Sequence, residues 1–473
     1  MFLRQIVDEK LAQYAYLIGC QRTGQALIID PERDIDRYVA AADAAGLRIV
    51  AVTETHIHAD FLSGAREFAE RYGTRVYLSD EGDADWKYEW AALSKYDCVL
   101  LHDGDTFRIG NIDVKAVHTP GHTPEHLVFL ITDTGADATE PMGMASGDFV
   151  FVGDLGRPDL LESAAGLHGA MRPSAERLYG SVQRFLHLPD FLQVWPGHGA
   201  GSACGKALGA VPETTVGYEK RFSAAIKAAR GGEEAFVDYI LKDQPEPPLY
   251  FARMKRDNRK GPPILGDLPR PRRMDPRALV TALNGRGIVV DTRLDRAGFM
   301  SRHLRGSLYA RFDRAFNTAV GSLLTDESTP LYLVIDDDHV EAAVRDLVRI
   351  GYDRIPGYAD PGEFEAYLAQ DGGSRTEQIE FADVEQLRAR PDQQVLDVRN
   401  ASEFQAGHVP GALNIAYTRL ADRLAEVPRD KALLVYCLSG ARAAVASAFL
   451  EANGWSVKYV GDNFGNYERI AAG

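Results

Sequence analysis

The segment with the clearest chemistry lies near the end of the chain and reads Cys437-Leu438-Ser439-Gly440-Ala441-Arg442. It follows an apolar run, residues 433–436, that predicts a buried strand, and it precedes an alanine-rich run that predicts a helix. Cys437 would then occupy a strand-to-helix turn, where the helix dipole and the loop N–H groups stabilise a thiolate. Arg442 adds a fixed cation for an anionic group. The segment therefore predicts a nucleophilic cysteine, with Ser439 and Arg442 as further catalytic residues.

The sequence around this segment resembles the rhodanese family of sulfurtransferases. Asp397-Val398-Arg399 closes an earlier predicted strand, and Gly407-His408-Val409-Pro410-Gly411-Ala412 follows it. The resemblance covers roughly the last hundred residues. It implies that Cys437 carries a persulfide between a sulfur donor and an acceptor. Leu438 stands where thiosulfate-using members often have a basic residue.

Composition limits the classes of partner. A length of 473 residues suggests about three domains. The net charge of -15 argues against nucleic acids and anionic membranes as partners. No apolar run is long enough to span a bilayer, and the first residues lack a signal-peptide core. The cysteines are few and widely spaced, which argues against a disulfide framework and favours the cytoplasm.

The chain divides at a proline-rich segment. Residues 243–275 predict a linker or extended arm after a first domain, residues 1–242. The remainder forms an internal repeat, residues 276–372 and 376–473, in which Asp291-Thr292-Arg293 corresponds to Asp397-Val398-Arg399. Each half alternates predicted strands and helices, which indicates a rhodanese-like domain with a parallel sheet. The predicted fold class is therefore α/β with several domains.

The two repeats are chemically unequal. Aligning residues 341–344 with residues 442–445 places Asp336 at the cysteine position and Glu341 at the arginine position. The first repeat would then lack the nucleophile and have an acidic residue where an anion would otherwise be bound. We therefore predict that the first repeat is inactive and the second is active. Its acidic cluster is an alternative metal site, although aspartates at a helix start are more often solvated caps. The inactive repeat also offers a surface for self-association, and we expect a homo-oligomer.

Histidines and carboxylates recur just after short apolar runs in the first domain. The segments are Thr55-His56-Ile57-His58-Ala59-Asp60-Phe61, Thr119-Pro120-Gly121-His122-Thr123-Pro124-Glu125-His126, Ser146-Gly147-Asp148 and Pro196-Gly197-His198. Open α/β folds and sandwich folds commonly place their functional residues in loops at strand ends. A single histidine would more often be structural, whereas several in such loops predict a metal site.

This pattern resembles the metallo-β-lactamase superfamily, whose fold is an αββα sandwich with metal at the edge between its sheets. Members often bind two metals through a His-x-His-x-Asp-His segment and a late histidine. Phe61 replaces the last histidine of that segment. A second metal would lose a ligand and meet an apolar ring, so we infer one metal per chain.

The chain also resembles the persulfide dioxygenase branch of that superfamily, the relatives of the ethylmalonic encephalopathy protein. The segment Gly153-Asp154-Leu155-Gly156-Arg157-Pro158-Asp159 adds to this resemblance. In that branch the metal is Fe(II). Carried over residue by residue, the ligands are His56, His122 and Asp148, a facial triad that leaves positions for O2 and for the terminal sulfur of a persulfide.

Four further residues are expected to support this site. His58, Asp60 and His198 would orient the ligands or hydrogen-bond a bound water. Superfamily hydrolases use the residue at the position of His58 as a zinc ligand, so that role is the alternative. Arg157 has the charge to meet an anionic substrate, with a surface ion pair as its alternative role.

Together the resemblances imply a bifunctional enzyme of sulfide detoxification. The first domain would oxidise glutathione persulfide or coenzyme A persulfide with O2, giving sulfite and the free thiol. The last repeat would move sulfur from a persulfide to sulfite, giving thiosulfate, or from thiosulfate to a thiol. The alternatives are a zinc-dependent glyoxalase II-type thioester hydrolase with an accessory rhodanese, and a non-catalytic sulfur sensor that uses Cys437 and Cys20.

Overall fold

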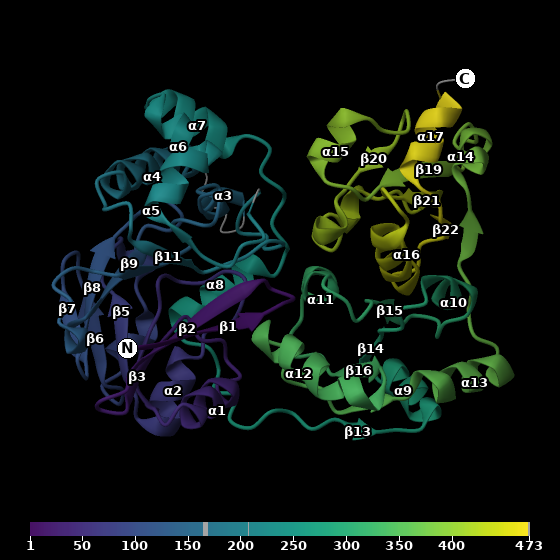
Figure 1. Cartoon of the computed structure of the whole chain (residues 1–473). Helices are drawn as coiled ribbons and strands as arrows, with labels where there is room; N and C mark the ends of the chain where they lie inside the picture. Colours follow the sequence, from purple (N-terminus) through teal and green to yellow (C-terminus); the bar gives the residue numbers. More distant parts are fainter. Residues whose placement is uncertain (164–168, 207, 472–473) are drawn as a thin grey trace. The chain divides into compact units, whose positions relative to one another are not determined.

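The computed structural model describes residues 1–163, 169–206 and 208–471 (Figure 1). The last two residues of the predicted final repeat thus lie outside the described residues. The chain forms two compact units. Unit 1 comprises Met1–Pro247 and Phe251–Asp267, and unit 2 comprises Pro248–Tyr250 and Leu268–Gly473.

Unit 1 contains two mixed sheets, each with six strands among the described residues. The first has the order β1-β2-β3-β4-β5-β6, with β1 Phe2–Asp8, β2 Gln13–Cys20, β3 Gln25–Ile29, β4 Arg48–Thr53, β5 Arg75–Ser79 and β6 Cys98–Leu101. The second has the order β12-β11-β10-β9-β8-β7, with β7 Thr106–Ile109, β8 Ile112–His118, β9 Leu127–Asp133, β10 Gly143–Gly147, β11 Gln193–Pro196 and β12 Thr214–Thr215.

Helices cover the outer faces of these sheets. They are α1 Asp36–Ala44, α2 Ala65–Tyr72, α3 Leu160–Ser163, α4 Met171–Phe185, α5 Val216–Phe222, α6 Ala224–Arg230, α7 Glu233–Leu241 and α8 Phe251–Lys260, with 3-10 turns η1 Ala84–Trp86, η2 Glu89–Ala92 and η3 Thr134–Ala136. Figure 1 shows α1 and α2 on one side of the sheets and α4, α6 and α7 on the other. The structure confirms the predicted αββα sandwich.

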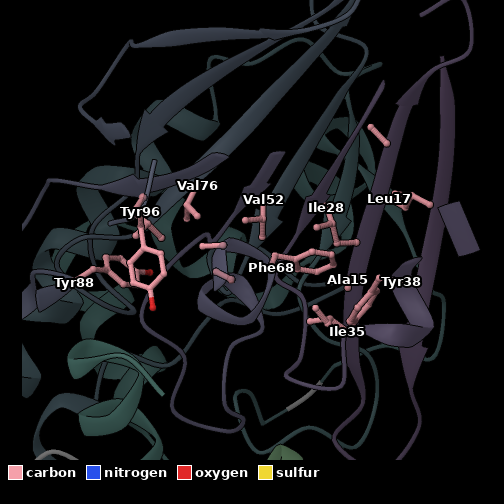
Figure 2. Packing of buried hydrophobic residues seen from close by; sticks show 14 of the residues in the cluster. Ala15, Leu17, Ile28, Ile35, Tyr38, Val52, Phe68, Val76, Tyr88 and Tyr96 are labelled. Atoms are coloured by element: carbon pink, nitrogen blue, oxygen red, sulfur yellow. The ribbon is translucent and has the colours of Figure 1, made fainter. Parts of the chain in front are cut away.

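Side chains that point alternately to the two faces of each sheet produce the layers. Inward-facing residues of both sheets, such as Ile18 and Phe129, form a core between the sheets. The opposite face of the first sheet packs on α1 and α2, where Ile28 and Val52 lie against Tyr38 and Phe68 (Figure 2). Because successive strand residues point to opposite faces, a strand that is apolar throughout serves two cores at once.

Unit 2 contains two parallel sheets, each with five strands in the part of the chain that the structure describes. The first has the order β13-β17-β16-β14-β15, with β13 Arg272–Arg273, β14 Ile288–Asp291, β15 Leu308–Tyr309, β16 Leu331–Val334 and β17 Gly357–Ala359. The second has the order β18-β22-β21-β19-β20, with β18 Glu377–Ile379, β19 Gln393–Asp397, β20 Leu413–Asn414, β21 Ala432–Tyr436 and β22 Val457–Val460. Both orders have the same pattern, which agrees with an internal repeat.

Helices complete each repeat. The first contains α9 Pro276–Asn284, α10 Arg296–Ser301, α11 Phe316–Leu323, η4 Asp337–His339, α12 Val340–Arg349 and α13 Pro361–Asp371. The second contains α14 Phe381–Leu387, α15 Ala401–Ala406, η5 Tyr417–Arg419, η6 Leu424–Glu426, α16 Ala441–Ala452 and α17 Phe464–Ala471. The predicted rhodanese-like α/β folds with parallel sheets are therefore present.

The expectation of an extended arm is wrong for part of residues 243–275. The helix α8 occupies a stretch without prolines and buries Phe251, Met254 and Asn258, which share one face of a helix. The following prolines lack N–H groups but keep their carbonyls, and Arg66 Nη1 donates to the carbonyls of Gly261 and Pro262. Residues 251–267 are therefore part of unit 1, whereas residues 248–250 and 268–275 belong to unit 2. No helix among the described residues is both long and apolar enough to cross a membrane.

Candidate metal centre and sulfur-transfer loop

Three loops at strand ends bring the predicted metal ligands together. His56 follows β4, His122 follows β8 and Asp148 follows β10, and one donor atom from each lies within 4.8 Å of the others. Asp148 Oδ2 lies 3.4 Å from His122 Nε2 and 4.0 Å from His56 Nε2. All three side chains are buried. The structure thus assembles a 2-His-1-carboxylate group from residues that are far apart in the sequence.

Hydrogen bonds fix the tautomers of both histidines. Thr55 Oγ1 donates to Asp30 Oδ2 at 2.9 Å, so it accepts the proton of His56 Nδ1, also at 2.9 Å. His122 Nδ1 donates to the carbonyl of Arg157 at 3.1 Å. Burial lowers the pKa of His122 to about 3 and that of His56 well below its usual value. Each histidine therefore presents an unprotonated Nε2, which is the atom that a metal needs.

The carboxylate of Asp148 accepts no ordinary hydrogen bond from the described residues, although the Cys204 thiol is near enough to favour its ionised form. Burial raises the pKa of Asp148 to about 6. A buried carboxylate facing two Nε2 lone pairs is costly without a cation. The donor set therefore fits a divalent transition metal, and these residues would hold it.

Two residues beside Asp148 set its position. Gly147 has a φ of 49°, and a Cβ at that residue would lie 2.5 Å from Thr55 Oγ1. His126 Nε2 accepts the backbone N–H of Asp148 at 3.1 Å, and its Nδ1 lies 2.9 Å from Thr119 Oγ1. The sequence alone does not indicate this role for His126. Its place in the same loop motif as His122 was the available signal.

Two carboxylates engage the Nε2 of His58, while its ring packs on that of His56, with 4.2 Å between ring centroids. The Nε2 of His58 lies 3.0 Å from Glu54 Oε2 and 3.1 Å from Asp30 Oδ1. Burial alone would lower the pKa of His58, but the two carboxylates raise it well above its usual value. The ring of Phe61 packs against His58, with 4.3 Å between ring centroids. His58 thus belongs to a buried network of acidic residues that also anchors Thr55.

A second group of donor atoms lies beside the first. Asp60, His198 and Cys204 each place one ligand atom within 4.8 Å of the others. His198 Nε2 lies 3.2 Å from Asp60 Oδ2 and 3.4 Å from Asp148 Oδ1. Burial raises the pKa of Asp60 to about 6. Asp60 and His198 are therefore close enough to Asp148 to influence what it binds.

Arg157 uses its guanidinium for internal contacts. Nε and Nη2 donate to Asp159 at 2.9 and 2.6 Å, and the remaining bonds go to the carbonyls of Ala203 and Pro245. The side chain is 1% exposed, so this ion pair is not on the surface. The contribution of Arg157 to the metal centre in this structure is its carbonyl, which orients His122.

The Cys437 loop joins β21 to α16, so the predicted strand and helix are both present. The backbone N–H of Ala443, in the first turn of α16, points to Cys437 Sγ at 3.4 Å. Gly440 ends the loop with a φ of 83°, and a Cβ there would collide with the Tyr459 hydroxyl. The sulfur is buried at the positive end of a helix.

Two neighbours of the cysteine already form hydrogen bonds with other residues. Arg442 donates two hydrogen bonds to the carboxylate of Glu403, at 2.6 and 2.7 Å. Ser439 is exposed, and its carbonyl accepts a hydrogen bond from Arg296 Nη1 at 3.0 Å. Arg442 is thus paired with a carboxylate beside the cysteine.

Strand register corrects the sequence alignment of the two repeats. Asp397 pairs with Tyr436 and Asp291 pairs with Val334, so the residue equivalent to Cys437 is Ile335 and not Asp336. The helices still align Val340 with Ala441, because the first loop is one residue longer. Ile335 is buried, whereas the side chain of Asp336 is 67% exposed. The first repeat therefore has an apolar residue at the position of Cys437.

Comparison with known proteins agrees with this geometry. Residues 9–198 match the model of the metallo-β-lactamase superfamily, and residues 380–468 match the rhodanese-like domain. A solved structure of a metallo-β-lactamase from Staphylococcus aureus is 39% identical, with a TM-score of 0.67, over 76% of this chain and 98% of that one. The chain therefore belongs to the metallo-β-lactamase superfamily and has, in addition, a rhodanese-like domain.

Two curated relatives indicate the range of chemistry in the superfamily. The mitochondrial persulfide dioxygenase ETHE1 of Bos taurus is 27% identical over 42% of this chain and 68% of its own length. A probable zinc-dependent hydrolase of polyketide biosynthesis, BaeB of Bacillus velezensis, is 24% identical over 44% of this chain and 82% of its own length. The superfamily match alone therefore does not choose between oxidation and hydrolysis.

Proposed function

We propose that this chain oxidises a low-molecular-weight thiol persulfide with O2 in unit 1 and transfers sulfane sulfur through Cys437 in unit 2. The observation that supports the first activity is that the donor atoms of His58 group with Glu54 and Asp30, and not with His56, His122 and Asp148. Without His58, the donor set is a facial triad, as in O2-activating Fe(II) enzymes. The proposed reaction converts RSSH, O2 and H2O into RSH and sulfurous acid.

Each residue of the centre has a task in this reaction. Fe(II) bound by the triad would supply O2 activation and a position for the terminal sulfur of the persulfide. The carbonyl of Arg157 and the hydroxyl of Thr55 keep both histidine Nε2 atoms free for the metal. Asp60 and His198 would hold a proton released when water enters the product, since they face Asp148 and are near each other.

The proposed role of Cys437 is to receive and pass on a sulfur atom. Its thiolate attacks the outer sulfur of RSSH, the S–S bond breaks, and RS⁻ leaves with the electron pair. Sulfite then attacks the outer sulfur of the Cys437 persulfide, which gives thiosulfate and restores the thiolate. The Ala443 N–H and the start of α16 support this role, because they stabilise sulfur as an anion before and after transfer.

A zinc-dependent thioester hydrolase is the second candidate. The observation in its favour is the adjacent group of Asp60, His198 and Cys204, which has donor atoms for another metal. Metal analysis of anaerobically purified protein, beside O2 uptake with glutathione persulfide, tests both candidates. We expect iron and persulfide-dependent O2 consumption. Two zinc ions, no O2 uptake and hydrolysis of S-lactoylglutathione would establish the hydrolase instead.

A further inference from the structure

A small cavity lies beside the Cys437 loop and is shared by the two repeats of unit 2. Its volume is about 60 Å³, space for roughly four water-sized groups. Arg311 and Asp313 line it from the first repeat, Tyr417 and Arg442 line it from the second, and alanine and valine side chains of both repeats form the rest of the wall. Ala441 and Arg442 form the first turn of α16, the helix whose start faces the sulfur. The repeat without a nucleophile therefore contributes to the surroundings of the one that has it.

Independent contacts fix the first repeat against this loop. Arg296 Nη1 donates to the Ser439 carbonyl at 3.0 Å, and its guanidinium lies against Gly440. The N–H of Thr376 donates to the carbonyl of Met300 at 2.9 Å. Both repeats belong to one compact unit. The presence of Arg311 in the cavity thus follows from a docked arrangement of the two repeats.

The two guanidinium groups that line the cavity differ in how strongly they are paired with carboxylates. Arg442 gives two hydrogen bonds to Glu403, whereas Arg311 has a single 3.3 Å contact from Nη2 to Asp313. Arg311 Nε is buried and has no hydrogen-bond partner among the residues that the structure describes. One oxygen of Asp313 is already used by the N–H of Ala315 at 2.9 Å. The guanidinium of Arg311 is therefore less strongly paired with a carboxylate than that of Arg442.

The remaining polar groups are mainly donors. Burial raises the pKa of Tyr417 to about 12, so its hydroxyl keeps its proton at neutral pH. The start of α16 adds the positive end of a helix dipole. Asp313 is the opposing charge. Two guanidinium groups, a phenol and a helix start around so small a space suit an oxyanion of a few atoms.

We propose that Arg311 of the first repeat, together with Arg442, binds the small sulfur oxyanion that exchanges sulfur with Cys437. The repeat that lost its nucleophile thus determines the acceptor of the repeat that kept it. The inference rests on the proposed sulfur transfer. In that step the sulfite sulfur bonds to the outer sulfur of the Cys437 persulfide, the Sγ–S bond breaks, and its electron pair returns to Sγ.

The test uses the full-length protein with Arg311→Met, the conservative variant Arg311→Lys, and Arg314→Met as a matched control at an exposed neighbour. Cys437 is first loaded with persulfide, and its single-turnover discharge is followed with sulfite and with neutral 2-mercaptoethanol at constant ionic strength. We expect the sulfite-to-thiol ratio of kcat/KM to fall about tenfold in Arg311→Met, mainly through the sulfite KM, because a charge-assisted hydrogen bond is lost. Arg311→Lys should recover part of the lost sulfite-to-thiol ratio, and Arg314→Met should have the same ratio as the wild type.

A binding experiment separates this inference from the proposed function. Thiosulfate is titrated calorimetrically into Cys437→Ser, which cannot accept the sulfur, with and without Arg311→Met. We expect the affinity to fall about tenfold in the double variant, for the same reason. Equal affinities together with an unchanged discharge ratio would overturn the role of Arg311. If the wild type transfers no sulfur, the proposed function fails, and the titration still decides whether Arg311 binds an oxyanion.

Discussion

At the scale of single residues, the metal centre depends on one carboxylate that accepts no ordinary hydrogen bond from the described residues. Asp148 faces His56 and His122 with both oxygens free of ordinary hydrogen bonds. We expect about one iron per chain in anaerobically purified protein. Asp148→Ala should lose the metal and the O2 uptake, because two histidines alone bind weakly, while sulfur transfer through Cys437 persists. Elemental analysis and an oxygen electrode measure both.

The matched control for this change is Asp43→Ala, since Asp43 is exposed on α1. It should keep both the iron and the O2 uptake. Two tightly bound zinc ions in the active wild-type protein would contradict the assignment of one iron to this centre.

A second residue-scale prediction concerns the products. Cys437→Ser should abolish sulfur transfer, because a serine hydroxyl stays protonated and cannot hold a sulfane sulfur. Persulfide-dependent O2 uptake should remain, since it belongs to unit 1. Sulfite should then accumulate where the wild type makes thiosulfate, as measured by product chromatography. Cys98→Ser is the control, and an unchanged sulfite-to-thiosulfate ratio in Cys437→Ser would separate the cysteine from the pathway.

At the scale of elements, α8 closes the loop that follows the first metal ligand. Asn258 Nδ2 donates to the carbonyls of His58 and Phe61 at 2.8 and 2.7 Å, and its Oδ1 accepts the N–H of Ser63 at 2.8 Å. Asn258→Ala should lower the free energy of unfolding of unit 1 by about 3 kcal/mol, because three buried backbone groups lose their partner. It should also reduce iron occupancy.

Urea denaturation and metal analysis check this prediction. The control is Lys260→Ala, an exposed position on the same helix. A loss of stability with full iron occupancy would mean that α8 supports the fold but not the metal loop.

A lysine on the same helix should make the stability of the folded chain depend on pH. Burial lowers the pKa of Lys255 to about 8 from 10.5, and its ammonium lies 3.3 Å from the ring centroid of Trp86. Below pH 8 the folded state bears the full free-energy cost of burying the charged ammonium. This cost disappears as the pH rises to about 10.5, where the unfolded chain also loses the proton. Lys255→Met should therefore be more stable at pH 7 by about 1–2 kcal/mol, a value discounted for residual hydration of the ammonium. The advantage should vanish near pH 10.5.

Urea denaturation across this pH range measures the difference, with Lys260→Met as the exposed control. A stability difference that stays constant from pH 7 to 10.5 would show that the ammonium is not penalised in the folded chain.

These elements also show what the sequence predicts well. The loops of His56, His122, Asp148 and Cys437 follow local patterns of apolar strand and polar turn, so their places in the fold were predictable. The role of Asn258 was not, because its partners lie 195 to 200 residues away in the sequence. The helix α8 was also hidden, since prolines on both sides made the whole segment look extended.

At the scale of the whole molecule, the two repeats differ at the position of Cys437. Register places Ile335 at the cysteine position, and the longer loop brings in Asp336 and its acidic neighbours. In a Cys437→Ser background, neither Ile335→Cys nor Asp336→Cys should restore sulfur transfer. A thiol at either position would meet the carboxylates of residues 336–338 and would have no arginine at the position of Glu341.

Single-turnover persulfide transfer in the full chain tests this statement, with the Cys437→Ser protein as the baseline and the wild type as the positive control. Transfer above the baseline in either double variant would show that the acidic loop can still hold a sulfur anion. It would also remove the reason for assigning the first repeat to a supporting role.

The position of α8 in the chain has a consequence for biosynthesis. Residues 58–63 leave the ribosome 195 to 200 residues before Asn258 does, an interval of roughly 10 to 40 seconds at ordinary rates of translation. All the metal ligands are therefore made well before the helix that secures their loop. A nascent chain that stops near residue 250 would contain the complete triad and still retain metal poorly. Maturation of the centre would then depend on translation of α8, the last helix of unit 1.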